Sequence, residues 1–293
     1  MKLIDGKEIS SLIKTEIAKE VFQLREERGR APHLAAILVG NDPASETYVA
    51  NKEKACQEVG MSSSVYKLPA DISEAELLKS IAFINNDNDV DGLIVQLPIP
   101  KHISVNKVIE SINPKKDVDG FHPVNVGRMV LGQGCYLPAT PFGISMLLQR
   151  SGIDTQGKNC VIVGRSNIVG TPMSILLSRN NALANATVTL CHSKTKNLPE
   201  VCKTADILIA AIGQCEMITA EYVKKGAGVI DVGMHRVADA TKKSGFRLKG
   251  DVKFDEVAPL CDFITPVPGG VGPMTIVGLI MNTLKAFKGE VYG

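Results

Sequence analysis

Short apolar runs alternate with longer segments of helical periodicity along most of this chain of 293 residues. Apolar runs bounded by Gly and Pro are typical of buried strands, and apolar residues repeated at helical spacing are typical of amphipathic helices. Their alternation predicts an α/β fold with a mostly parallel sheet. Neither an internal repeat nor a low-complexity linker is visible in the sequence.

The first half of the chain carries clear signals for where its elements begin and end. Asp42 can cap a helix whose first position suits Pro43, and Gly60 closes that helix. Ser73 and Glu76 have the spacing of a capping box. We expect helices at about residues 9–28, from 43 to 60, from 73 onward and at 105–112, strands at 34–39, 64–68 and 93–97, and a long loop from 113 to about 140.

The second half begins after a helix that starts at Thr140-Pro141 and links the two halves. Strands are expected at 160–163, 186–190, 207–211, 229–232 and 263–265, with helices from about 171 and from 274 to 287. The last helix is long and apolar, so we expect it to return and pack on the first half. The pattern predicts a domain of residues 1–140, joined by the helix 274–288, a second domain of residues 141–293, and a cleft between the two.

Charge and composition exclude several classes of function. Lys and Arg number 33 against 31 Asp and Glu, which gives no electrostatic footprint for nucleic acid or a membrane surface. Charged residues such as Lys2 and Asp5 interrupt the N-terminal segment, and no apolar run approaches the ~20 residues of a membrane span. The seven cysteines include no Cys-x-x-Cys pair, so we expect no disulfide framework and no metal site. We interpret the protein as cytoplasmic.

A glycine-bearing turn follows the first strand of the second half. Gly164 allows a sharp turn after that strand, and Gly170 allows the next helix to start close to the sheet or to a phosphate. Backbone N–H groups at such a helix start favour an anion. Arg165 and Ser166 occupy the turn, so its spacing departs from G-x-G-x-x-G, and an ordinary strand-to-helix turn is the alternative. The context favours a Rossmann-type dinucleotide-binding domain.

The second strand of this domain ends without a carboxylate. An NAD site usually has Asp or Glu there to hold the ribose 2′-hydroxyl. The sequence instead continues as Cys191-His192-Ser193-Lys194-Thr195, whose polar groups could accept a 2′-phosphate with Arg165 nearby. A solvated polar loop is the alternative, and we favour NADP as the cofactor.

The helix after Pro43 carries candidate catalytic residues. Ser45, Tyr48 and Lys52 fall on one helical face, and a Tyr and a Lys at this spacing can hydrogen-bond. A lysine in a cleft can serve as an acid or a base. The alternative is a surface lysine whose stem lies along a tyrosine ring.

Two polar residues stand at strand or loop ends in the same half. Gln96 lies inside an apolar run, and a buried amide must find partners. Asp119 lies in the polar turn Asp117-Val118-Asp119-Gly120-Phe121, where an Asp-Gly pair is often structural. Ligands of open α/β sheets bind beyond the carboxyl ends of the strands. Gln96 and the start of the Tyr48 helix both lie at such ends, which favours a functional interpretation.

A third segment is rich in glycine and proline. Residues 265–275 contain three glycines and three prolines, which predicts a rigid loop with exposed backbone before the last helix. Such a loop suits the close approach of a flat ligand.

These segments together resemble the bifunctional methylenetetrahydrofolate dehydrogenase/cyclohydrolase family over essentially the whole chain. The matching segments are Tyr48-Val49-Ala50-Asn51-Lys52, Gln96-Leu97-Pro98-Ile99-Pro100, Lys116-Asp117-Val118-Asp119-Gly120-Phe121, Gly164-Arg165-Ser166-Asn167-Ile168-Val169-Gly170, Cys191-His192-Ser193-Lys194-Thr195 and residues 266–275. The resemblance implies an N-terminal catalytic domain, a C-terminal NADP-binding domain and two reactions. Methylenetetrahydrofolate is oxidised to the methenyl form with NADP+, and water then opens that form to 10-formyltetrahydrofolate.

The resemblance also implies roles for individual residues. Lys52 handles protons in the hydrolytic step, Tyr48 packs on the folate, Gln96 bonds near Lys52, and Asp119 holds the pterin. The implied substrate-binding residues are Ser45, Tyr48, Gln96, Leu97, Pro98, Asp119, Pro268, Gly269 and Gly270. The implied cofactor-binding residues are Gly164, Arg165, Ser166, Ile168, His192, Ser193, Met234 and Thr275. A homodimer and a role in one-carbon metabolism and purine biosynthesis are implied in the same way.

The chain departs from the family pattern in small ways. Ala139 stands where Cys is frequent, Met234 replaces a more usual Ile, and the segment 178–185 is longer than is typical. Two other functions stay open on residues alone. One is another NADP-dependent dehydrogenase with the same domain order, similar to shikimate dehydrogenase, and the other is a non-catalytic dinucleotide-binding protein.

Overall fold

The computed structural model describes residues 1–182, 184–242 and 245–292. By internal contacts the chain forms two compact units. We call residues 12–139 with 276–293 the first unit, and residues 1–11 with 140–275 the second. Helices α1 (Gly6–Arg28) and α10 (Val271–Lys288) each have residues in both units.

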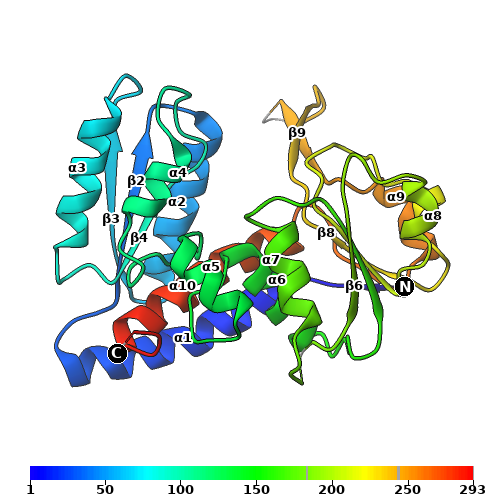
Figure 1. The fold of residues 1–293 in the computed structure, drawn as a ribbon, viewed down its shortest axis with the longest axis horizontal. Helices are drawn as coiled ribbons and strands as arrows, with labels where there is room; N and C mark the ends of the chain where they lie inside the picture. The colour runs from blue at the N-terminus through cyan, green and yellow to red at the C-terminus, as the bar shows by residue number, and fades with distance from the viewer. Residues whose placement is uncertain (183, 243–244, 293) are drawn as a thin grey trace. The chain divides into compact units, whose positions relative to one another are not determined.

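The first unit is built on a parallel sheet of β2 (His33–Val39), β3 (Ser62–Leu68) and β4 (Gly92–Val95) in the order β3-β2-β4. Helices α2 (Pro43–Glu58), α3 (Glu74–Asn85) and α4 (Val105–Ser111) connect and flank these strands (Figure 1). Apolar side chains of β2 and β4 pack with those of α3 and α4 in one core, including Ile37, Leu77, Ile81 and Leu93. Burial of both sheet and helix faces explains the near-continuous apolar runs of the strands.

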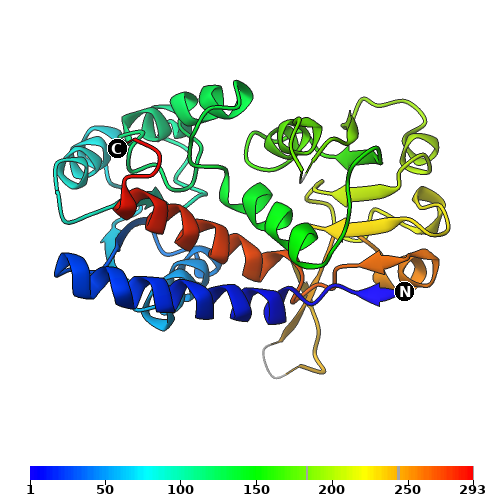
Figure 2. The same cartoon turned by 90° about the horizontal axis from the view of Figure 1, so that it is seen from below.

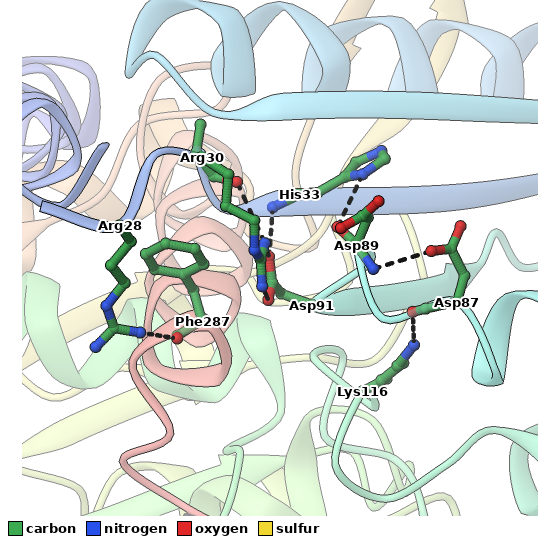
Figure 3. A network of polar contacts seen from close by, with 9 residues as sticks. Arg28, Arg30, His33, Asp87, Asp89, Asp91, Lys116 and Phe287 are labelled. Atoms are coloured by element: carbon green, nitrogen blue, oxygen red, sulfur yellow. Dashed lines mark hydrogen bonds and ion pairs between the residues drawn. The ribbon is translucent and has the colours of Figure 1, made fainter. Parts of the chain in front are cut away.

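The last helix packs within the first unit. Its residues from Ile276 onward run beside α1, as both views of the ribbon show (Figures 1 and 2). The Phe287 ring lies between two guanidinium groups, 4.8 Å from that of Arg28 and 4.7 Å from that of Arg30 (Figure 3). Arg28 also donates to the Phe287 carbonyl at 2.6 Å, which satisfies an acceptor at the end of the helix.

The second unit contains a parallel sheet of six strands in the order β1-β11-β8-β7-β5-β6. The strands are β1 (Lys2–Leu3), β5 (Asn159–Val163), β6 (Thr187–Cys191), β7 (Ile207–Ala210), β8 (Gly228–Asp231) and β11 (Phe263–Ile264). The helices are α6 (Ala139–Arg150), α7 (Gly170–Ser178), α8 (Leu198–Cys202) and α9 (Phe254–Val257), with short 3-10 turns η1 (Ala220–Tyr222) and η2 (Ala258–Leu260). A hairpin of β9 (His235–Ala238) and β10 (Phe246–Lys249) projects beside the sheet. The expected α/β class with parallel sheets is confirmed.

The predicted helix caps are confirmed, and two loops are shorter than expected. Asp42 caps α2, and Ser73 and Glu76 form the predicted capping box. The loop expected from 113 to 140 instead contains α5 (Pro123–Val130), which the His122 side chain caps; Gly127 in the interior of this short helix weakens its helical signal. The loop expected to continue to 275 ends earlier, because α10 begins at Val271. Pro273 is tolerated in its first turn, where N–H groups have no helical partner.

No helix in the described part of the chain is long and apolar enough to cross a membrane. Residue 183, inside the long segment 178–185, lies outside the described residues.

Candidate active site

Lys52 and Gln96 form a direct contact in the first unit. Lys52 lies on α2 and Gln96 directly follows β4. The Lys52 Nζ donates to Gln96 Oε1 at 3.0 Å, and Gln96 Nε2 donates to the Leu97 carbonyl at 2.6 Å. Both side chains are half-buried, so the bond fixes the direction of the ammonium beside the sheet edge.

A bridge to β4 followed by a turn brings Asp119 to the same edge. Leu93 of β4 pairs in parallel with Asp117, and Leu93 N donates to the Lys116 carbonyl at 2.7 Å. The chain then turns at residues 118–119, closed by the bond from Gly120 N to the Asp117 carbonyl at 3.0 Å, and this turn carries Asp119 at the end of β4. Burial raises the pKa of the Asp119 carboxyl, and the charge of Lys52 partly opposes that rise.

The Asp119 carboxylate has no hydrogen bond to another described residue, and Asp119 is half-buried. A carboxylate withdrawn from water in this way favours N–H donors from a ligand. The first unit thus presents an ammonium, an amide and a carboxylate at one sheet edge.

Two residues of the α2 face take different positions. Tyr48 is 40% exposed, one helical turn before Lys52. Ser45 is buried, and both its N–H and its hydroxyl donate to Asp42 Oδ2 at 2.8 Å. The Ser45 hydroxyl is thus held by Asp42, the residue that caps the helix. Leu97 is half-buried and Pro98 exposed, with a cis peptide bond between them.

In the glycine turn of the second unit, two glycines lie in close contact with backbone carbonyl groups. Gly164 has φ 118°, and a Cβ there would lie 2.0 Å from the Ala211 carbonyl oxygen. A Cβ on Gly170 would lie 1.8 Å from the Gly164 carbonyl oxygen. Both positions therefore require glycine, and the start of α7 sits directly over the end of β5. The geometry matches a phosphate-binding turn.

The neighbouring turn after β6 lies at the same edge. Gly164 N donates to the Cys191 carbonyl at 2.9 Å, which aligns the ends of β5 and β6. His192 N donates to Thr195 Oγ1 at 2.9 Å, and Lys194 N donates to His192 Nδ1 at 3.2 Å. The side chains exposed along the two turns are Arg165, Ser166, Asn167, Ile168, Ser193 and Lys194. They make a cationic and hydroxylic surface without a carboxylate.

A small pocket lies at the ends of β8 and β11. Residues 231–234 and 266–272 line it. Lys7 N donates to the Gly269 carbonyl at 3.1 Å, and a Cβ on Gly6 would lie 1.8 Å from the Gly270 carbonyl oxygen. Pro268 and Met234 are exposed at this pocket. The hydroxyls of Thr140 on α6 and Thr275 on α10 form a hydrogen bond of 3.0 Å.

Two buried carboxylates shape these strand ends and were not predicted. Asp231 accepts from the N–H groups of Gly233, Asp251 and Val252, and burial raises the pKa of Asp231 to about 7. Asp251 accepts from the N–H groups of Ile212 and Gly213, and it lies 2.7 Å from His235 Nε2. Asp251 follows Gly250 and Asp231 lies two residues before Gly233, a signal that also fits ordinary turns.

Comparison with known proteins gives full-length matches. Residues 4–119 match the model of the tetrahydrofolate dehydrogenase/cyclohydrolase catalytic domain, and residues 138–291 match that of its NAD(P)-binding domain. The chain is 61% identical over 292 residues to the bifunctional protein FolD of Phocaeicola vulgatus, covering 100% of each.

Solved structures agree with this. The bifunctional FolD enzyme of Campylobacter jejuni is 47% identical, with a TM-score of 0.92 and 99% of each chain covered. The Trypanosoma brucei dehydrogenase-cyclohydrolase, solved with NADP cofactor and an inhibitor, is 38% identical with a TM-score of 0.93, covering 99% of this chain and 98% of that one.

Proposed function

Because this chain belongs to the tetrahydrofolate dehydrogenase/cyclohydrolase family, we propose that it oxidises 5,10-methylenetetrahydrofolate with NADP+ and hydrolyses the methenyl product to 10-formyltetrahydrofolate. The observation that carries the proposal is the edge of the first sheet, where Lys52 bonds Gln96 and its charge acts on the buried carboxyl of Asp119. One face thus offers both a proton-handling group and a carboxylate for N–H donors.

The pterin would bind at Asp119. A pterin carries adjacent N–H donors on one edge, and the Asp119 carboxylate has no hydrogen bond to another described residue. Pairing with the pterin would satisfy this carboxylate. Tyr48 would pack on the folate with its exposed ring, while Leu97, Pro98, Pro268, Gly269 and Gly270 would complete the walls. Ser45 would contact the folate beside Tyr48, with its hydroxyl held by Asp42.

The oxidation step requires a cofactor that accepts hydride from the one-carbon bridge, and bound NADP+ supplies that chemistry. The chain's part is to orient the two reactants and exclude water. Asp119 would fix the pterin plane, and the Lys52–Gln96 pair would limit where the bridge can lie.

The hydrolysis step needs water activated beside an already electrophilic carbon. The Lys52 Nζ would accept a proton from the attacking water and later return it to the departing ring nitrogen. Gln96 would hold the amine in position through its Oε1, while its own N–H remains bonded to the Leu97 carbonyl. Neither a metal nor a covalent nucleophile is needed for this sequence of steps.

The second unit fits NADP. Its turn requires glycine at Gly164 and Gly170, and the chain after β6 offers His192, Ser193 and Lys194 with no acid. Arg165 and Lys194 would bind the 2′-phosphate, and Ser166 and Ile168 would contact the cofactor at the turn. Met234 and Thr275, near the pocket of residues 231–234 and 266–272, would lie toward the nicotinamide.

Further parts of the proposal concern assembly and location. Lys52 would belong to a folate domain, residues 1–140 with the helix 274–288, and the nicotinamide would bind to an NADP domain, residues 141–293. The protein would act as a cytoplasmic homodimer that supplies one-carbon units for purine synthesis.

One spectroscopic assay tests the proposal. Methylenetetrahydrofolate and NADP+ should yield NADPH together with a methenyl absorbance that rises and then decays. Asp119→Asn should raise the KM for folate, and Asp71→Asn, which alters an exposed carboxylate, should not. NADPH formed from shikimate and no methenyl signal would favour the shikimate-dehydrogenase-like alternative, which the family matches do not support.

A further inference from the structure

We propose that Asp117 is a positioning residue that fixes the orientation of Asp119, and that Tyr292 supports it through Asn125. The inference rests on the proposed function, which assigns the pterin to Asp119. It adds a specific cause for that carboxylate's placement, one that involves a residue far away in the chain.

Asp117 ties the backbone together on both sides of Asp119. Its Oδ1 accepts from Phe121 N at 3.2 Å, and its Oδ2 accepts from His122 N at 2.8 Å. Its carbonyl accepts from Gly120 N at 3.0 Å. Asp117 is only 1% exposed, so these bonds face little competition from water.

Asn125 holds the Asp117 carboxylate from the other side. Its Nδ2 donates to Asp117 Oδ2 at 2.9 Å and to the Pro114 carbonyl at 3.0 Å. Its Oδ1 accepts from Tyr136 N at 3.3 Å and from the Tyr292 hydroxyl at 2.8 Å. Asn125 is fully buried, and these four bonds use the complete capacity of a primary amide.

Tyr292 is the most distant member, beyond the end of α10. Its ring packs under the Arg128 guanidinium at 4.4 Å and against the Tyr136 ring at 5.8 Å. These contacts hold the ring in place, so its hydroxyl is aimed at Asn125 before any ligand binds. Loss of that hydroxyl would leave Asn125 Oδ1 with only the longer hydrogen bond from Tyr136 N among the described residues.

The segment around the turn is also held by bonds from other elements. Lys116 Nζ donates to the Ile84 carbonyl at 3.0 Å and to the Asp87 carbonyl (Figure 3). Asn282 Nδ2 donates to the carbonyls of Val118 and Leu137, both at 2.8 Å. The remaining freedom of Asp119 therefore lies in the turn that Asp117 closes.

This arrangement matters because Asp119 has no hydrogen bond of its own to another described residue. Its direction is set by backbone alone, and the backbone is set by Asp117. A small rotation of the turn would move the carboxylate away from the pterin donors without removing any group that touches the substrate.

The test uses Tyr292→Phe in the full chain. Loss of one buried hydrogen bond is expected to raise the KM for methylenetetrahydrofolate by about fivefold. The kcat and the KM for NADP+ should each change by less than about twofold. Tyr222→Phe, which removes the hydroxyl of a half-buried tyrosine in the second unit, is the matched control and should change nothing.

A double variant separates positioning from general destabilisation. In an Asp119→Asn background, Tyr292→Phe should no longer raise the folate KM, because it acts through Asp119. An undiminished rise in that background, or an equal rise in the KM for NADP+, would overturn the inference.

Amide hydrogen exchange gives a readout that needs no substrate. Tyr292→Phe should speed exchange at the amides of Gly120, Phe121 and His122 more than at those of β2. Unchanged exchange there would overturn the inference even if the enzyme is active. Absence of methenyl formation by the unaltered protein would instead count against the proposed function alone.

Discussion

Replacing Gly170 with alanine tests the dinucleotide turn most directly. The new Cβ would lie 1.8 Å from the Gly164 carbonyl oxygen and 2.6 Å from its carbon, both backbone atoms. The start of α7 would have to move by more than about 1 Å, since buried backbone cannot rotate away. Overpacking of this kind costs about 1–3 kcal/mol in unfolding free energy.

The same displacement moves the N–H groups at the helix start. Anion binding there depends on hydrogen bonds of about 2.7–3.1 Å, so a shift of this size should weaken NADP+ binding at least tenfold. Titration calorimetry with NADP+ and urea unfolding would measure the two effects on one sample.

Gly127→Ala is the matched control, because a Cβ at Gly127 in α5 meets nothing within 4 Å. It should raise the unfolding free energy by about 0.5–1 kcal/mol through helix propensity, with NADP+ affinity unchanged. If Gly170→Ala bound NADP+ as well as the unaltered protein did, the assignment of this turn to the cofactor would be wrong.

Three further predictions concern single groups. Lys52→Gln should abolish methenyl hydrolysis while the NADP+ dissociation constant stays within about twofold, because Lys52 belongs to the first unit and the glycine turn to the second; calorimetry and the methenyl assay decide between this and a shared loss. Arg165→Ala should raise the KM for NADP+ about tenfold and leave that for NAD+ unchanged, as two-cofactor kinetics would reveal; an equal rise for both would remove Arg165 from the 2′-phosphate. The pKa of Asp231, raised to about 7 by burial, means that the folded protein keeps a proton the unfolded chain loses. Its stabilisation is complete below the ordinary carboxyl pKa of about 4 and is lost as pH rises through 7, so urea unfolding should give a lower free energy at pH 8 than at pH 5.5, with a smaller difference in Asp231→Asn.

Local sequence signals predicted the elements best. The Asp42 cap and the Ser73–Glu76 capping box depend on residues within one turn of each other, so spacing alone identifies them. The glycine positions 164 and 170 were recognised for the same reason, although the contacts that require them involve Ala211 and the turn's own carbonyl. The hairpin β9–β10 and helix α5 were missed because each is short and half-exposed, and because Gly127 lowers the helix propensity of α5.

Contacts between distant residues could not be predicted. Tyr292 bonds Asn125 across 167 positions, and Asn282 bonds the Val118 carbonyl across 164. Ser45 was expected on the same helical face as Tyr48, and the bond of its hydroxyl to Asp42, the residue that caps α2, could not be read from helical spacing. Helical spacing places residues on a face but does not say which partner each one finds.

The candidate site shows how polar groups can be both costly and useful. Asp117 satisfies its carboxylate with backbone and amide donors and so serves the fold, whereas Asp119, two residues later, has none among the described residues. A fold under selection for stability alone would favour an apolar or fully bonded side chain at such a half-buried position. The charge of Lys52 compensates only part of the cost of burial, since burial remains the larger influence on the pKa of Asp119. The contrast between these neighbouring aspartates is the reason to look for a ligand with N–H donors at this edge and not at the turn that supports it.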